Sequence, residues 1–128
     1  PKADSVAHRR GMEYVLDTIK RENAGREIVF VLDADYRKMY ASGKAERFPV
    51  NDTISELCEV RGIPCIDMAG ALAERYRRDR QRHDFVIDRH WNSHGHRVVA
   101  EIIYEELVKR GILNFADAAA SPTTVRHQ

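Results

Sequence analysis

The segment of residues 88–96, Asp-Arg-His-Trp-Asn-Ser-His-Gly-His, holds the residues best suited to chemistry, and it leads directly into a helical pattern. Asp88 lies two residues before His90 at the start of that pattern. A catalytic Asp/His pair needs a carboxylate that accepts the Nδ1 proton of the ring, because Nε2 is then left to take a proton from a nucleophile. The spacing therefore predicts that Asp88 and His90 form a base and its orienting acid.

The nucleophile that such a base would activate is not evident in the sequence. An exposed catalytic serine typically occupies a tight, glycine-bracketed turn that follows a hydrophobic strand. None of the five serines has this setting; they are Ser5, Ser42, Ser55, Ser93 and Ser121. The sequence therefore predicts half of an active site.

The composition sets limits on the class of protein. A chain of 128 residues with 43% hydrophobic content fits one globular domain with a real core. A net charge of +1 gives no strong field, and the basic run at residues 75–82 includes acidic Asp79, so we expect a solvated helix end and no nucleic-acid binding. No apolar run approaches the roughly 20 residues of a membrane span. Cys58 and Cys65 have apolar neighbours and are expected to be reduced core thiols.

Hydrophobic periodicity divides the chain into alternating helices and strands. A continuous apolar run predicts a buried strand at residues 28–32, and a shorter one predicts a second strand at residues 63–66. Residues 34–51 are expected to form a long polar loop. The predicted helices run from about residue 4 to 22, from a capping box at Thr53 and Glu56 to Gly62, from 69 to about 82, and from a cap at Asn92 or Ser93 to Gly111.

This order of elements predicts an α/β fold with a parallel sheet. Strand, crossover helix and strand make one βαβ unit. Two strands leave two open edges, so we expect a piece of a larger doubly wound sheet whose missing strands lie on the N-terminal side. The residues expected in the core are Val29, Val31, Leu32, Leu57, Ile66, Leu72, Val99, Ile102 and Ile103.

The order of these elements and the Asp-x-His-Trp-Asn block with Gly95-His96 resemble the C-terminal half of an SGNH (GDSL-type) hydrolase domain, over about residues 3–111. The resemblance implies a partial flavodoxin-like three-layer sandwich in residues 1–113, followed by a flexible tail at 114–128. It also implies that Asp88 and His90 are the catalytic acid and base. A single residue separates them, which resembles a subset that includes alginate-type O-acetyltransferases and related carbohydrate esterases.

By this resemblance the chain belongs to an ester hydrolase or O-acyltransferase with a Ser-His-Asp mechanism that needs no cofactor. No position matches the serine of the family's first block or its oxyanion-hole glycine and asparagine. We therefore expect residue 1 to lie beyond those blocks in a longer protein, and the isolated chain to be inactive. The implied substrate is a small-molecule, carbohydrate or lipid ester. The implied partner is the missing N-terminal half or a second copy of the chain.

Trp91 has two interpretations. It follows the base directly and begins the entry to the last helix, which favours a packing residue at the pocket wall. An indole beside a catalytic base is also suited to binding a sugar ring, so Trp91 stands as a substrate-binding candidate.

Two alternatives come from other functional classes. His90, His94 and His96 together with Asp88 supply four potential metal ligands in nine residues, which would suit a metal-dependent hydrolase. Against this, Gly95 and the helix start should turn these side chains in different directions. The other alternative is a non-catalytic interaction module that presents its open sheet edge to a partner strand.

Overall fold

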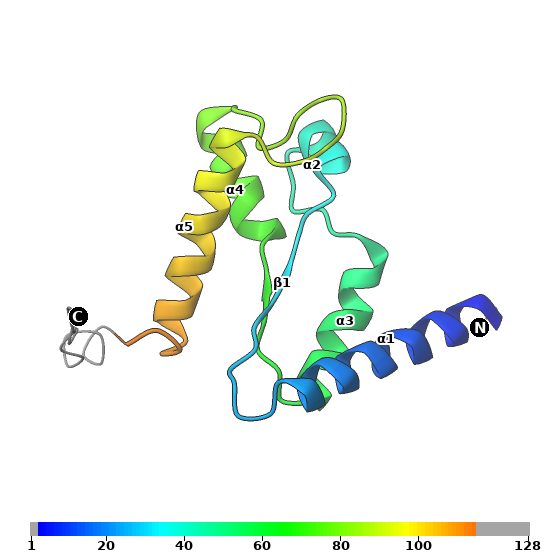
Figure 1. The fold of residues 1–128 in the computed structure, drawn as a ribbon. Coiled ribbons are helices and arrows are strands. Elements are labelled where there is room, and N and C mark those ends of the chain that lie inside the picture. The colour runs from blue at the N-terminus through cyan, green and yellow to red at the C-terminus, as the bar shows by residue number, and fades with distance from the viewer. Residues whose placement is uncertain (1–2, 115–128) are drawn as a thin grey trace, which may run out of the picture.

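The computed structural model describes residues 3–114, which form five helices and two short strands (Figure 1). In chain order these are α1 (Ala3–Glu22), β1 (Phe30–Leu32), α2 (Tyr36–Ser42), α3 (Pro49–Val60), β2 (Cys65–Asp67), α4 (Ala69–Asp79) and α5 (Ser93–Lys109). The fold is therefore mixed α/β and mostly helical. Within these residues, no helix combines the length and apolarity needed to cross a membrane.

The two strands form a parallel pair at the centre of the molecule. Phe30 lies opposite Cys65, and Leu32 lies opposite Asp67. One further hydrogen bond, from Met68 N to Leu32 O at 3.0 Å, continues the pairing beyond β2. The predicted order of strand, crossover helix and strand is confirmed, although both strands are shorter than the apolar runs that predicted them.

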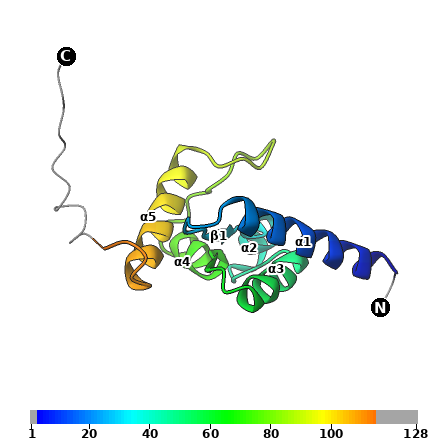
Figure 2. The same cartoon turned by 60° about the horizontal axis from the view of Figure 1, so that its bottom comes forward.

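Helices cover the strand pair from two sides, with α1 and α3 on one side and α4 and α5 on the other (Figures 1 and 2). Side chains alternate across a strand, so neighbouring residues of β1 and β2 face different helices. Leu16 of α1 and Leu57 of α3 form one core with Phe30 and Cys65 packed against it. The larger core contains Ile66 and the buried faces of α2, α4 and α5; its other members are Ala34, Tyr36, Met39, Met68, Ala69, Leu72, Ala73, Val98, Val99 and Ile102.

Residues 34–51 are not the continuous loop that the sequence predicts. They contain the whole of α2, which begins after Asp35, whose side chain accepts a hydrogen bond from Lys38 N at 3.2 Å. The helix ends at Gly43, which has a φ of 68°. Seven residues are too few for a repeating apolar pattern, and Asp35 and Gly43 are the only local signals of this helix.

The start of α3 also differs from the prediction. The capping box at Thr53 predicted a start four residues later than the observed one at Pro49. Proline suits the first turn of a helix because its fixed φ is already helical and its missing N–H has no intrahelical partner there. Thr53 therefore lies inside α3, and its role as an N-cap was wrong.

Most of the predicted core is buried, but Val31 is not. Its side chain is 36% exposed, although the residue lies opposite the buried Ile66. Among the described residues, no third strand pairs with β1, so the outer edge of this strand stays open. Val29 and Ile103 are partly buried and pack against the larger core, whereas the other six predicted core residues are buried. Of the predicted tail at 114–128, all but residue 114 lies outside the described residues.

Candidate functional site

The Asp-Arg-His-Trp-Asn motif of residues 88–92 lies in the segment between α4 and α5. Residues 84–91 double back on themselves and are closed at their base by an antiparallel bridge between Asp84 and Trp91. Inside this 84–91 loop, Phe85 N donates to His90 O at 2.9 Å and Arg89 N donates to Phe85 O at 3.1 Å. Arg89 has a φ of 65°, which turns the backbone just before His90.

Asn92 joins the base of this loop to α5. Its Nδ2 group donates to Arg82 O at 2.8 Å and to Asp84 O at 3.2 Å. Its Oδ1 atom accepts from Gly95 N at 2.8 Å, which confirms Asn92 as the N-cap of α5. Asn92, the polar residue that follows His90 and Trp91, therefore has a largely structural role.

Gly95 allows the first turn of α5 to approach the chain closely. A Cβ atom at this position would lie 1.9 Å from His83 O, much less than a non-bonded contact. No larger residue fits without a shift of the backbone.

The side chains of Asp88 and His90 lie in contact. His90 Nδ1 lies 3.3 Å from Asp88 Oδ2, and His90 N donates to Asp88 Oδ1 at 3.1 Å. The backbone N–H of His90, followed by its side chain, lowers the pKa of Asp88 below its ordinary value. Both side chains are exposed, with 83% for His90 and 56% for Asp88. The carboxylate is therefore held ionised against Nδ1, which leaves Nε2 of His90 uncommitted to this pair.

His90 borders a cleft of about 310 Å³ that is also lined by Asp33, Arg89, Trp91 and His96. Asp33 follows β1 directly, so the cleft lies at the carboxyl end of this parallel strand, where ligands commonly bind in α/β folds. None of the five lining residues is serine, threonine or cysteine. The residues that line the cleft thus include two imidazoles and a carboxylate but no hydroxyl or thiol side chain.

Trp91 connects the cleft to the strand. Its Nε1 group donates to Asp33 Oδ2 at 3.1 Å, and its ring lies edge-on to His96 at 5.5 Å between centroids. The indole also packs against the larger core while it lines the cleft. Sequence reasoning missed Asp33, whose only signal was its position after the buried strand.

The four metal ligands that the sequence suggested are divided between two places. His90 and His96 line the cleft, whereas His94 Nε2 lies 3.2 Å from Asp79 Oδ2 at the end of α4. Among residues 3–114, only one group of three potential ligands comes together, and it consists of Asp79, His83 and His94. The grouping of Asp88, His90, His94 and His96 into one centre is therefore wrong, because α5 turns His94 away from the cleft.

The two cysteines are free, as expected. Cys58 is fully buried, and burial raises its pKa to about 11. Burial also raises the pKa of the half-buried Cys65. A thiol whose pKa is raised has little of the thiolate that attacks substrates or binds metals, so neither cysteine is suited to nucleophilic chemistry.

A search against protein-family models, curated proteins and solved structures found no match to this chain.

Proposed function

We propose that this chain supplies the acid and base of an ester hydrolase or O-acyltransferase of the SGNH type. The observation that carries the proposal is the contact of 3.3 Å between Asp88 Oδ2 and His90 Nδ1 beside the cleft. The single-residue spacing within an Asp-x-His-Trp-Asn block supports the same family.

In the proposed mechanism, His90 Nε2 takes the proton of a serine hydroxyl as the serine oxygen attacks the ester carbonyl. Asp88 keeps the proton of the neutral ring on Nδ1 and stabilises the imidazolium that forms. His90 then returns the proton to the leaving alcohol. The acyl group passes from serine to water in a hydrolase, or to a sugar hydroxyl in an acyltransferase.

The serine must come from outside the cleft residues of this chain. In the proposal it is supplied by an N-terminal half of the same domain. The open edge of β1, with Val31 exposed, is the place where additional strands would pair and extend the sheet. The helices on both sides of the strand pair support a flavodoxin-like sandwich as the complete fold.

The substrate in this proposal is a small-molecule, carbohydrate or lipid ester that enters the cleft beside His90. Trp91 forms one wall and is oriented by its hydrogen bond to Asp33. Because that bond fixes the indole, we assign Trp91 first to the wall of the pocket and second to stacking against a sugar ring.

The test is hydrolysis of an aryl acetate by the natural protein that contains this chain. Asp88→Asn and His90→Ala should each lower kcat/KM by about 10⁴-fold while the protein stays folded. The matched control is His8→Ala, an exposed histidine on α1 that does not line the cleft. A folded His90→Ala variant with wild-type turnover would exclude the mechanism.

A further inference from the structure

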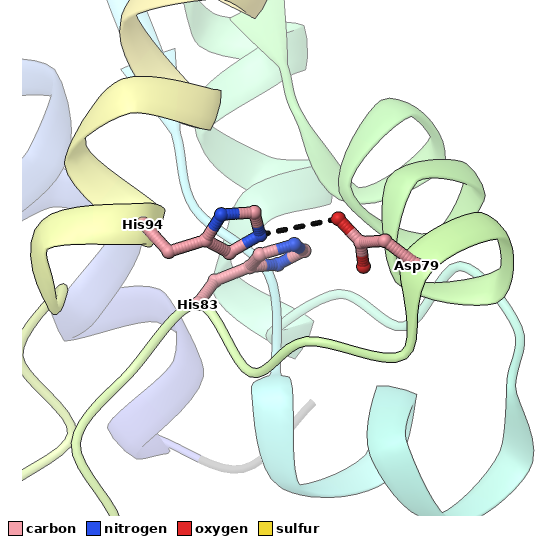
Figure 3. Close-up of side chains that lie close together, drawn as sticks. All are labelled: Asp79, His83 and His94. Carbon is pink, nitrogen blue, oxygen red and sulfur yellow. Dashed lines mark ion pairs between the residues drawn. The ribbon is translucent and has the colours of Figure 1, made fainter.

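Three side chains from separate segments come together on the side of α5 that faces α4. Asp79 ends α4, His83 lies in the connecting segment, and His94 lies in the first turn of α5 (Figure 3). One potential ligand atom from each residue lies within 4.8 Å of the other two. The two imidazole rings stack at 5.3 Å between centroids and 27° between planes.

His83 is the most unusual member of this group. The residue is fully buried, and neither ring nitrogen has a hydrogen-bond partner among the described residues. Buried polar groups are nearly always paired, so an imidazole without a partner points to an absent ligand.

His94 shows the same feature at its inward nitrogen. Its Nε2 atom is buried and lies 3.2 Å from Asp79 Oδ2, but the two groups are not aligned as a hydrogen bond. Two donor atoms of a tetrahedral zinc site lie about 3.3 Å apart, given metal–ligand distances of about 2.0–2.1 Å. The separation of these two atoms therefore matches an edge of such a site.

We propose that Asp79, His83 and His94 bind one divalent transition metal of the zinc class. Two imidazoles and one carboxylate form a ligand set that zinc accepts, with the fourth position filled by water. Asp79 Oδ1 already accepts a hydrogen bond from Gln81 N at 2.9 Å, which orients Oδ2 toward His94. This site is independent of the proposed acyl transfer, and none of its ligands lines the cleft.

Arg97 contacts one of the proposed ligands and should affect how tightly this site binds a metal. Its guanidinium lies 3.1 Å from His94 Nδ1, so it donates to that nitrogen and leaves the ring proton on Nε2. A metal on Nε2 moves the proton to Nδ1, where it faces the guanidinium, and Arg97 must move away. Arg97 is exposed and free to do so. Arg97→Gln should therefore tighten metal binding, because the glutamine side-chain oxygen can accept a hydrogen bond from the Nδ1–H group.

The metal would fix the segment that carries the candidate base. Asp79 and His83 come before the 84–91 loop and His94 comes after it, so one ion would join both ends. His83 O already accepts from Asn92 N at 3.0 Å. We infer a structural role for the ion, in which it stiffens the base of this loop.

The experiment uses the untagged 128-residue chain, treated with a chelator and titrated with zinc chloride in a calorimeter. One zinc ion should bind per chain, and Co²⁺ in its place should give the visible absorption of a tetrahedral complex. His83→Ala and Asp79→Asn should each weaken binding by at least 10-fold. Asp79→Asn is the safer variant, because the Asp79 side chain is 27% exposed and the amide keeps its shape.

His90→Ala and His96→Ala are the matched controls, since both remove a histidine of the same motif without touching this cluster. They should bind zinc as tightly as the wild-type chain does. Circular dichroism of each variant separates loss of a ligand from loss of the fold. Absence of zinc binding to the folded wild-type chain, or equal binding by folded Asp79→Asn, would overturn the proposal. Loss of binding in His90→Ala or His96→Ala would overturn it as well.

Discussion

Trp91 and Asp33, 58 residues apart in the chain, are joined by a hydrogen bond of 3.1 Å from the indole Nε1 to a carboxylate oxygen. Asp33 Oδ1 also accepts from Ala34 N at 2.8 Å, so both oxygens of this carboxylate are engaged. The bond attaches the loop segment before α5 to the carboxyl end of β1. It is therefore the contact that holds the candidate base beside the strand.

Trp91→Phe should destabilise the chain by about 1–3 kcal/mol, because it removes a partly buried hydrogen bond to a charged group. Urea unfolding measures this free energy. Tyr14→Phe is the matched control, since the Tyr14 side chain is 70% exposed and its loss of a hydroxyl should change stability little. Equal stability of the two variants would contradict a structural role for the indole N–H.

The carboxyl group of Asp88 should titrate below an ordinary aspartate. The main cause is the backbone N–H of His90, and the His90 side chain adds to it. His90→Ala should therefore raise the pKa of Asp88 only part of the way to its usual value. The lowered pKa means that the stabilisation is present above the unfolded-state pKa of about 3.9 and is lost as the pH falls through the folded-state value. NMR titration of the Asp88 carboxyl carbon tests both points, and an ordinary pKa in the wild-type chain would contradict the pairing.

Gly95→Ala should destabilise the chain by about 1–3 kcal/mol or more, since the added Cβ would meet a backbone oxygen that cannot move freely. Gly70→Ala is the matched control inside α4, where nothing lies within 4 Å of the added atom. Alanine loses less backbone entropy than glycine in a helix, and Gly70 is the second residue of α4, so Gly70→Ala should stabilise by at most about 1 kcal/mol. Thermal unfolding distinguishes the two, and a neutral Gly95→Ala would refute the close approach of α5 to His83.

The isolated chain should associate rather than remain a monomer. Val31 is exposed on the open strand, and an apolar groove of about 570 Å³ lies between α1 and Phe30. Val31→Lys should reduce association, because a charged side chain on an edge strand opposes pairing with another strand. Val60→Lys is the control, as Val60 is 81% exposed at the end of α3. Light scattering should give more than the mass of one chain for the wild type and for Val60→Lys, and a monomeric wild type would disprove the prediction.

The isolated chain should also lack esterase turnover. The cleft residues include no serine, threonine or cysteine, and a base without an aligned nucleophile can activate only water. An aryl-acetate assay of the purified chain tests this. Hydrolysis that disappears in His90→Ala would show that this chain contains its own nucleophile.

Local sequence patterns predicted the features that depend on neighbouring residues. Asn92 was recognised as a possible cap because a polar residue precedes an apolar periodic run, and the short spacing of Asp88 and His90 predicted their contact. The helix α2 was missed because it is shorter than a recognisable period. The capping box at Thr53 competed with Pro49, and the proline marks the observed start.

Contacts between distant segments could not be predicted in this way. The bond between Trp91 and Asp33 depends on how the last loop folds back over the strand. The approach of His94 to Asp79 and His83 depends on the packing of α5 against α4, which no spacing within the motif reveals. His94 and His96 point in different directions from the first turn of α5. His94 therefore lies with Asp79 and His83, whereas His96 lines the cleft with His90.

The hydrogen bonds that the Asn92 side chain donates at the base of the 84–91 loop have a consequence for how the sequence can change. Both ends of the 84–91 loop are held by the Asp84–Trp91 bridge and by the Asn92 amide, while Ile87 within it is 97% exposed. Changes of length between such fixed ends cost little, because the loop-closure entropy grows only with the logarithm of loop length. The exposed residues Val86 and Ile87 can therefore be exchanged, and the chain between them extended, without disturbing α4 or α5, whereas the backbone of Phe85 is bonded to His90 and Arg89.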